Sequence, residues 1–356
     1  MIHLAIDTVG AKFGGAATVA SDVVRSALAQ DRVTRLTVFG SRAGSRRFQW
    51  PSDPRLRVVE PGYPDEGLLG RTFWPLYGLS RAAKRAGATH LLCLSNAGIG
   101  ASGLPTTVFI QQPLPFSWEA LSRFRTHEQV YVQAAQQVTH LSALRARAVA
   151  VQTPTMQRWV MRDFALPERR VVVVPPDPGA ALALSPKPRA GRRILYVGST
   201  SAHKNVDCLG QAKRILEQRY PDLQVAVSLP KEHALVQRYA FEPLGYMSQE
   251  QLSLEYERAT VLVLPAFVET VGLPLLEAMR HGCPVVVADR PYAFDVCGDA
   301  ALRFDPNVPV NLARTLEQIW QEPAATAERV QMGLQRIRAQ HARGGYAQLI
   351  ELAIRA

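Results

Sequence analysis

The amino-acid sequence predicts an α/β protein made of two Rossmann-like domains, each with a doubly wound parallel sheet. Its 356 residues correspond to roughly two domains of about 150 residues each. Short β-branched runs alternate with helical segments along the whole chain, which is the βαβ rhythm of parallel sheets. A stretch rich in proline and glycine, PPDPGAALALSPKPRAGRR, divides the chain nearly in half. We therefore expect an N-terminal domain at 1–175, a linker at 176–192 and a C-terminal domain at 193–340.

Strands of the N-terminal half are expected where aliphatic and β-branched residues cluster between turn residues. These runs are residues 2–7, 35–40, 57–60, 90–96, 106–111, 148–152 and 170–174. Amphipathic segments at 16–29 and 80–86 are expected to form helices between them.

The same rhythm restarts after the linker. Expected strands are 193–197, 224–229, 261–265, 284–288 and 301–304, and expected helices are 206–219, 249–259, 274–281, 309–321 and 324–340. Pro274 begins one helix and Gly282 follows its end, as their preferences at helix termini predict. The segment 341–356 forms a last helix, for which packing back on the N-terminal domain is one arrangement. Two domains facing a cleft would bind ligands beyond the carboxyl ends of their strands.

The composition is that of an ordinary globular protein, with 47% hydrophobic and 20% charged residues. It excludes disordered, collagen-like and coiled-coil classes. Cys93, Cys208, Cys283 and Cys297 include no CxxC pair, so neither a zinc ribbon nor a disulfide scaffold is predicted, and a cytoplasmic setting is the expectation. Because no stretch reaches 18 apolar residues, we expect a soluble chain or one attached only at a membrane surface.

The positive charge is concentrated in the first half of the chain. Residues 1–175 contain 21 Lys and Arg against 11 Asp and Glu, whereas residues 176–356 contain 20 against 19. This asymmetry indicates an anionic partner for the N-terminal half, either nucleic acid or an acidic membrane surface. The alternative is that arginine serves only solubility.

A loop after the strand at 193–197 has the features of an anion site. Lys204 stands just before Asn205, which we expect to cap the helix that follows. A helix N-terminus presents unpaired N–H groups and partial positive charge, so with Lys204 it suits a phosphate or diphosphate. The alternative is a purely structural loop.

A second loop, after the strand at 261–265, carries two carboxylates. Glu269 lies in the loop and Glu277 lies one turn into the following helix. A carboxylate can accept two hydroxyl hydrogen bonds, as from ribose or a hexose, while the amides of Val271 to Leu273 face the same point. The alternatives are that Glu277 only complements the helix dipole and Glu269 is a solvated charge.

These strings resemble those of a known family. The string ETVGLPLLEAMRHGCPVV over 269–286 resembles the Glu, seven residues, Glu signature of GT-B glycosyltransferases of family 4, which are retaining and use nucleotide sugars. YVGSTSAHKN over 196–205 is similar to the donor-diphosphate loop of that family, LGYMSQEQL over 244–252 to its base-binding loop, and FDVCGDAALRFDP over 294–306 to the usual ending. The resemblance covers residues 190–310 strongly and the N-terminal half weakly.

The resemblance implies a role for each matched residue. Glu277 would hold the ribose hydroxyls, Glu269 the donor sugar, and the amides of Val271, Gly272 and Leu273 the sugar and phosphate oxygens. Lys204 would neutralise the leaving diphosphate, so Glu269 and Lys204 are the implied catalytic pair. The remaining implied donor contacts are Thr200 and Asn205 in the first loop, Tyr246 and Met247 beside the base, and Gly14 and Gly15 in a glycine loop of the N-terminal domain.

The chain departs from the family pattern at two places. Many members have an arginine where Ser199 and Thr200 stand, which leaves more of the diphosphate charge to Lys204 and the helix amides, or to another arginine that reaches in. Many also have a histidine where Gln111 or Gln112 follows the strand at 106–111. A sugar hydroxyl contact could survive there but proton transfer could not, and an ordinary loop role is the alternative.

The mechanism implied is retaining transfer without a metal. No DxD triplet or HExxH spacing is present, so no cofactor is expected beyond the nucleotide-diphosphate sugar as co-substrate. Charge on the leaving phosphate would be stabilised by Lys204, helix dipoles and loop amides. The acceptor hydroxyl would attack from the face of the leaving group, and no enzyme nucleophile is required.

The segment 66–85 suggests the acceptor. It sets Trp74, Tyr77 and other large apolar residues among arginines and lysines, which suits anionic lipid, although aromatics packed in a core are the alternative. We therefore expect transfer of a mannose-like or rhamnose-like hexose to a lipid-linked glycan of a surface polysaccharide (O-antigen or exopolysaccharide), by a peripheral protein at the inner face of the cytoplasmic membrane. The alternatives are a transferase or epimerase with a soluble substrate, and a degenerate donor-binding module; nucleic acid is not expected.

Overall fold

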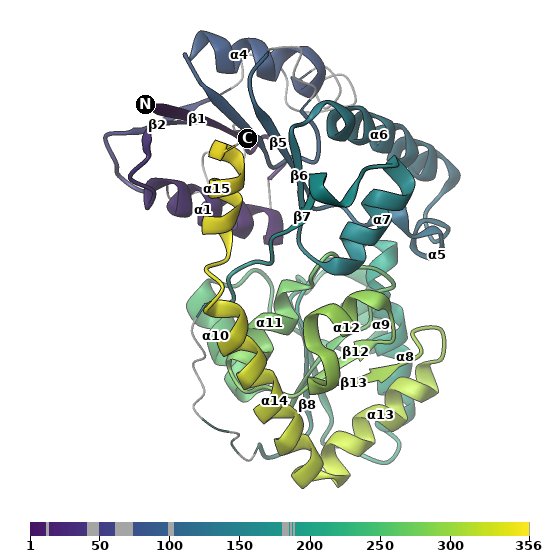
Figure 1. Ribbon diagram of the computed structural model, residues 1–356. Helices are drawn as coiled ribbons and strands as arrows, with labels where there is room; N and C mark the ends of the chain where they lie inside the picture. Colours follow the sequence, from purple (N-terminus) through teal and green to yellow (C-terminus); the bar gives the residue numbers. More distant parts are fainter. Residues whose placement is uncertain are drawn as a thin grey trace. The chain divides into compact units, whose positions relative to one another are not determined.

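The structure is a computed structural model that describes residues 1–11, 14–40, 50–60, 74–98, 103–179, 185, 187 and 189–355. It divides into two compact units, whose elements are labelled in Figure 1. Unit 1 comprises Met1–Phe116, Arg125–Asp177 and Gly344–Ala356, and unit 2 comprises Ser117–Phe124 and Pro178–Arg343. The chain therefore passes between the units after Phe116, Phe124, Asp177 and Arg343.

The described strands of unit 1 form a parallel sheet of seven strands in the order β3-β2-β1-β4-β5-β6-β7. Their bounds are β1 Ile2–Asp7, β2 Val33–Phe39, β3 Leu56–Val59, β4 His90–Cys93, β5 Thr106–Ile110, β6 Ala148–Val151 and β7 Val171–Val173. Every residue of β5 and β6 is buried. Central strands of a parallel sheet are covered on both faces, and for this reason they read as continuous apolar runs in the sequence.

The helices of unit 1 include the end of the chain. Their bounds are α1 Gly14–Leu28, α4 Leu79–Arg85, α6 Thr126–Arg145, α7 Pro154–Phe164 and α15 Tyr346–Arg355, with the short turns η1 Trp74–Gly78, η2 Leu114–Phe116 and η3 Glu168–Arg170. Helix α15 packs against α1 (Figure 1) and buries Leu349 and Ile350. Its Tyr346 ring meets Phe109 of β5 edge to face, with 6.2 Å between the ring centroids. The C-terminal helix is thus an integral part of the core of unit 1.

The described strands of unit 2 form a second parallel sheet, of six strands, in the order β10-β9-β8-β11-β12-β13. Their bounds are β8 Arg193–Tyr196, β9 Gln224–Val227, β10 Glu242–Pro243, β11 Val261–Leu264, β12 Val285–Ala288 and β13 Ala301–Phe304. The chain builds outward from β8 to β10, then returns to the other side of β8 to add β11, β12 and β13. The strand order therefore reverses between β8 and β11, which makes this the switch point of the sheet.

Helices of unit 2 cover this sheet. Their bounds are α5 Trp118–Leu121, α8 Val206–Leu216, α9 Ala234–Tyr239, α10 Gln249–Arg258, α11 Leu273–Arg280, α12 Pro291–Cys297, α13 Pro309–Gln321 and α14 Pro323–His341, with η4 Ala202–Lys204 and η5 Gly298–Ala300. Helix α10 starts in a capping box, because the Ser248 hydroxyl accepts from the Gln251 amide while the Gln251 side chain accepts from the Ser248 amide. Helix α13 buries Leu312, Leu316 and Ile319 on one stripe, as an amphipathic surface helix does.

The two predicted sheets are present, but several helices were not predicted. Helix α6 has 20 residues, of which only Ser142 and Ala143 are buried, so its apolar residues do not mark one face. Helices α7, α9 and α12, and the two-residue strand β10, were also missed. The segment Ser117–Phe124, expected within the N-terminal domain, groups with unit 2.

The segment 66–85, expected at a membrane surface, contains both buried and exposed residues in its described part. Trp74 and Leu79 are buried in the core of unit 1, so the interfacial interpretation is wrong for these two residues. Trp74 also donates a 3.0 Å hydrogen bond from its indole N–H to the Asp7 carboxylate. Tyr77 is exposed, and residues 66–73 lie outside the described part of the chain. None of the helices in the described ranges has the length and apolar character needed to cross a membrane.

Candidate functional site

The loops predicted to carry chemistry leave neighbouring strands at one edge of the sheet of unit 2. The first loop follows β8 and contains Thr200 and Lys204, and the second follows β11 and contains Glu269 and Gly272. Neighbouring strands are about 4.8 Å apart, and their carboxyl ends meet at the same edge. The two loops therefore meet at the switch point, where open α/β sheets bind their ligands.

An ion pair joins the two loops. The Nζ of Lys204 donates to Oε1 of Glu269, and the two side chains are 19% and 11% exposed. The residues are 65 positions apart in the sequence, so only the fold brings them together. The backbone amide of Phe267 also donates a 2.8 Å hydrogen bond to the carbonyl of His203. The two loops are thus joined by the ion pair and by a backbone hydrogen bond.

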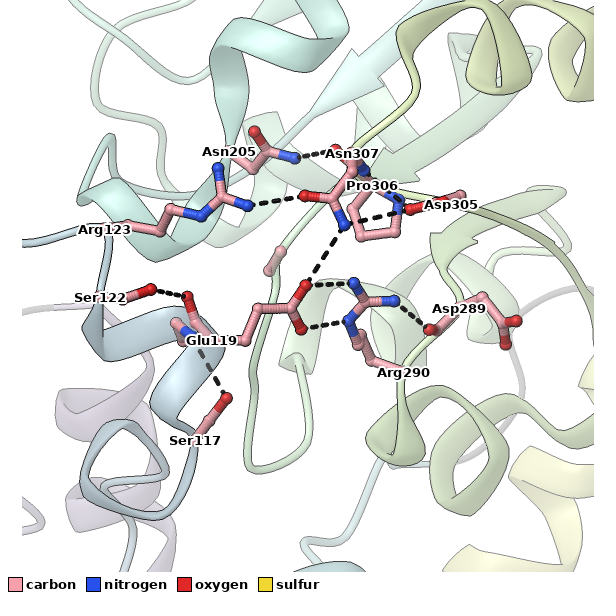
Figure 2. Close-up of polar contacts among 12 residues, drawn as sticks. Ser117, Glu119, Ser122, Arg123, Asn205, Asp289, Arg290, Asp305, Pro306 and Asn307 are labelled. Carbon is pink, nitrogen blue, oxygen red and sulfur yellow. Dashed lines mark hydrogen bonds and ion pairs between the residues drawn. The ribbon is translucent and has the colours of Figure 1, made fainter.

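Asn205 stands where helix α8 begins, but it does not cap the helix with its side chain as predicted. Its backbone is left-handed, with φ of 54°, and no hydrogen bond runs from its side chain to the first turn. The side-chain amide instead donates a 2.8 Å hydrogen bond to the carbonyl of Pro306 (Figure 2). Asn205 therefore links the first loop to the loop after β13.

Glu277 lies on α11 and is held by a tyrosine of the neighbouring helix α10. The hydroxyl of Tyr256 donates a 2.6 Å hydrogen bond to Oε2 of Glu277. Burial raises the pKa of Glu277, and the bond from Tyr256 and the charge of Arg280 offset this only in part. One carboxylate oxygen is fixed by Tyr256, which leaves Oε1 with its acceptor capacity for a ligand hydroxyl.

The start of α11 explains why glycine occupies position 272. Gly272 has φ of 68°, and a Cβ atom there would come within 2.8 Å of Cδ2 of the buried Leu264. A larger residue would therefore clash as well as strain the backbone. Leu273 and Pro274 begin the helix directly after it, and the first N–H groups of a helix have no partner within the helix. The amides of Val271, Gly272 and Leu273 lie in this turn.

Thr200 is engaged with a residue that the sequence analysis did not single out. Its hydroxyl lies 3.0 Å from Nε2 of His233. The Leu235 amide donates to Nδ1 of the same ring, so Nε2 carries the hydrogen and donates to Thr200. Tyr246 is 83% exposed in the loop after β10, and Met247 is half-buried beside it. Their loop lies two strands from β8 at the same edge of the sheet.

His203, next to Lys204, stays neutral. Burial and the adjacent Lys204 charge lower its pKa to about 3. Its Nδ1 atom is buried and has no hydrogen-bond partner in the part of the chain that the structure describes. The ring instead stacks on Phe124, with 5.8 Å between the centroids. His203 is therefore a packing residue rather than a second cation in the loop.

The remaining predicted residues lie in unit 1. Gly14 starts α1 with φ of 58°, and Gly15 follows it in the first turn. Gln111 follows β5; its amide nitrogen donates a 2.9 Å bond to the carbonyl of Leu94, and its backbone N–H donates to Asn96. Gln112 accepts from the Leu114 amide through its side chain. Both glutamines thus make hydrogen bonds within unit 1 itself.

Buried tyrosines support the site, and the sequence analysis missed them. Tyr196 donates to the carbonyl of Ser199 in the first loop, Tyr292 to that of Ala266 in the second, and Tyr256 to Glu277. All three are at most 1% exposed. Tyr196 ends an apolar strand, and Tyr256 and Tyr292 lie in helices, so no motif distinguished them from core residues in the sequence. No cluster of three or more His, Cys, Asp or Glu able to hold a metal occurs among the described residues.

Comparisons with known proteins match this site region. Residues 185–335 match the family Glycosyl transferases group 1. The chain is 30% identical over 203 residues to O-antigen chain mannosyltransferase B of Escherichia coli, which covers 51% of this chain and 53% of that protein. The chain thus spans about half the length of this curated relative.

Solved structures match over the whole chain. Sucrose-phosphate synthase from Thermosynechococcus elongatus has a TM-score of 0.77 at 18% identity, covering 100% of this chain and 98% of its own. WaaG, a glycosyltransferase involved in lipopolysaccharide biosynthesis, has a TM-score of 0.77 at 15% identity, covering 98% and 99%. At these identities the likeness shows the fold, which is the GT-B fold that the sequence predicted.

Proposed function

We propose, from the premise that residues 185–335 belong to the Glycosyl transferases group 1 family, that the chain transfers a hexose from a nucleotide-diphosphate sugar. The observation that carries the proposal is the ion pair between Lys204 and Glu269 at the switch point, with Glu277 one helical turn into α11. A cation for phosphate and two carboxylates for hydroxyls are the groups that such a donor needs.

The proposed donor contacts come from the loops after β10, β8 and β11 and from helix α11. The loop of Tyr246 and Met247 takes the base, Glu277 takes the ribose, Lys204 the diphosphate and Glu269 the sugar. Thr200, Asn205 and the amides of Val271, Gly272 and Leu273 complete the set within unit 2. A donor that enters the site meets Lys204 already paired, so its phosphates share that cation with Glu269.

The proposed chemistry is retaining and needs no metal. As the bond between the sugar and the leaving phosphate breaks, negative charge grows on the phosphate, and Lys204 and the loop amides stabilise it. The acceptor hydroxyl attacks from the same face, and a phosphate oxygen takes its proton. Because Gln111 and Gln112 cannot transfer a proton, no residue at that strand end is assigned acid or base work.

The proposed product is a surface glycan. Similarity to the mannosyltransferase of Escherichia coli favours a mannose-like sugar and a growing O-antigen-type acceptor. The excess of basic residues in 1–175 favours an acceptor anchored in anionic lipid at the inner face of the cytoplasmic membrane. A soluble acceptor, or a donor-binding module without turnover, is the second candidate, and Ser199 and Thr200 in place of an arginine are the observation in its favour.

A thermal-shift panel tests the donor site. GDP-mannose, UDP-glucose, UDP-GlcNAc and dTDP-rhamnose are added to the wild type, to Glu277→Ala, and to the control Glu217→Ala, which changes an exposed residue directly after α8. A ligand that binds only the folded state raises the melting temperature. We expect a rise with one donor in the wild type and the control, and none in Glu277→Ala. A rise that persists in Glu277→Ala would remove its ribose role.

Salt-dependent flotation with liposomes tests the acceptor. Association with anionic vesicles that weakens as salt increases supports a lipid-linked acceptor, because salt screens surface charge. Absence of association at low salt supports the soluble one.

A further inference from the structure

A short segment from the N-terminal half of the chain is built into unit 2. Residues Ser117–Phe124, here called the strap, follow η2 of unit 1 and precede α6 of unit 1, yet they group with unit 2. Ser117 caps the single turn α5, and Ala120 and Leu121 are buried. The strap therefore has a short helical turn with two buried residues, while Trp118, Ser122 and Arg123 are exposed.

One end of the strap is fixed by a two-pronged ion pair (Figure 2). Arg290, which follows β12, donates from Nε to Oε2 of Glu119 over 2.8 Å and from Nη2 to Oε1 over 2.5 Å. Asn307, in the loop after β13, donates a 3.3 Å bond to the same carboxylate. Arg290 is 19% exposed at its side chain. A bidentate pair of this kind is stronger and more directional than an ordinary surface ion pair.

The other end of the strap lies on the donor loops. The guanidinium of Arg123 lies 4.1 Å from the centroid of the Phe267 ring and donates a 2.6 Å bond to Oδ1 of Asn307. Phe124 stacks on His203 with 23° between the ring planes. Phe267 is two residues before Glu269, and His203 is the residue before Lys204. The backbone bond from Phe267 to His203 joins these two contact points.

The strap thus contacts the loops after four neighbouring strands, β8, β11, β12 and β13. Among the described residues before Pro178, the strap alone is assigned to unit 2. Its contacts flank the Lys204–Glu269 pair on the chain but do not include either side chain. An element that contacts the neighbours of the site residues, and not the site residues themselves, can hold the geometry of the site.

We propose that the strap is a positioning element of the donor site, with Glu119, Arg123 and Phe124 as positioning residues that hold the Lys204 and Glu269 loops in register. The expected consequence is that diphosphate binding depends on the strap, a segment of the N-terminal half of the sequence. This part of the inference rests on the proposed function. The structural part of the inference can be tested without any ligand.

Hydrogen exchange followed by mass spectrometry provides the ligand-free test. The variants are Glu119→Ala, Arg123→Ala and Phe124→Ala in the full chain, all of which leave the residues of the donor loops unchanged. We expect exchange in 199–205 and 266–272 to accelerate at least about fivefold, the lower end of coupling between sites. Exchange in α14 should not change, which shows that unit 2 remains folded.

Conservative variants distinguish a loss of loop positioning from a general loss of folding. Phe124→Tyr keeps a ring for His203, and Arg123→Lys keeps a cation over Phe267, so both should retain the exchange rates of the wild type within about twofold. Glu217→Ala removes an ion pair between Lys213 of α8 and Glu217, whose side chain is 45% exposed, and serves as the matched control. Equal exchange in the two loops for wild type and all three alanine variants would overturn the inference.

Nucleotide titrations test the functional part. Dissociation constants of GDP, GMP, UDP, UMP, dTDP and dTMP are measured for the wild type and the strap variants. We expect the constant for the preferred diphosphate to rise about fivefold in Glu119→Ala and Phe124→Ala, and that for its monophosphate to change less, because Lys204 acts on the diphosphate. An equal effect on both nucleotides would overturn positioning of the Lys204 loop. A wild type that binds none of them overturns the proposed function, while the exchange result still decides on the strap.

Discussion

The hydroxyl of Tyr256 donates a 2.6 Å hydrogen bond to Oε2 of Glu277, and this bond joins helix α10 to helix α11 inside unit 2. Tyr256 is buried and Glu277 is half-buried, so the bond fixes one oxygen of the carboxylate within unit 2. Glu277 nevertheless has a raised pKa because burial outweighs the help from Tyr256 and Arg280. A buried carboxylate that is not fully compensated is costly to keep, which is common at functional sites.

Replacing Glu277 by glutamine should stabilise the fold at neutral pH. The pKa of Glu277 is raised in the folded state, whereas in the unfolded chain it has its usual value of 4.5. The folded state therefore holds the proton more tightly. The free energy of unfolding therefore falls as pH rises from 4.5 through the raised pKa, and the glutamine variant escapes this loss. We expect a higher melting temperature for Glu277→Gln at pH 7 and no difference below pH 4.5, measured by circular dichroism across this range. A lower melting temperature at pH 7 would contradict it.

Lys204→Ala should affect the rate of transfer more than the fold. The substitution removes the cation that faces the leaving phosphate and leaves Glu269 without its partner. Loss of a donor to developing charge lowers kcat by about 10²–10³-fold, and an unpaired, partly buried carboxylate costs about 1–3 kcal/mol of stability. Steady-state rates at saturating donor and urea unfolding measure the two effects. Lys204→Arg, which keeps the charge, should lose less activity, and equal losses would argue against a charge role.

Gly272→Ala should be more damaging than Gly245→Ala. Both glycines have positive φ, 68° and 65°, so an alanine strains the backbone at either position. Only at Gly272 does the added Cβ meet a buried side chain, at 2.8 Å from Leu264, whereas nothing lies within 4 Å at Gly245. We expect a loss of about 1 kcal/mol for Gly245→Ala and about 2–3 kcal/mol for Gly272→Ala. Chemical denaturation compares the two, and equal losses would show that the turn relaxes.

His203→Phe should make the stability of the fold less dependent on pH between pH 7 and 4. The unfolded chain takes up a proton on this histidine near pH 6.5, while the folded state resists until about pH 3. Stability from this residue is therefore complete above pH 6.5 and is lost as pH falls between these values. Phenylalanine retains a ring for Phe124 and does not titrate. Melting temperatures from pH 7 to 4 should fall less steeply in the variant, and parallel curves would show that His203 is solvated.

The sequence was sufficient for the described strands other than β10 and for the loops that leave the sheets. Strands such as β5 and β11 are continuous apolar runs, and Pro274 and Gly282 mark the ends of a helix from sequence alone. Helix α6 was missed because its apolar residues are spread around the helix, and only Ser142 and Ala143 of its 20 residues are buried. Local periodicity predicts a helix only where its apolar residues gather on one face.

The partners of the site residues could not be predicted in the same way. Lys204 and Glu269 were each assigned to a loop, but their ion pair depends on β8 and β11 being neighbours in the sheet. The bond from Tyr256 to Glu277 depends on how α10 packs on α11, and the contact from Glu119 to Arg290 spans 171 positions. Such contacts follow from tertiary packing, which no short motif encodes.

The most direct test of the central claim is transfer of labelled sugar. The donor selected by the thermal-shift panel, labelled in its hexose, is incubated with the protein and a membrane lipid extract, and label in the lipid and aqueous glycan fractions is counted. We predict that label moves to the lipid fraction with wild type and falls by about 10²-fold or more with Lys204→Ala. Donor that binds without any release of nucleotide or movement of label would contradict the account and leave a binding module.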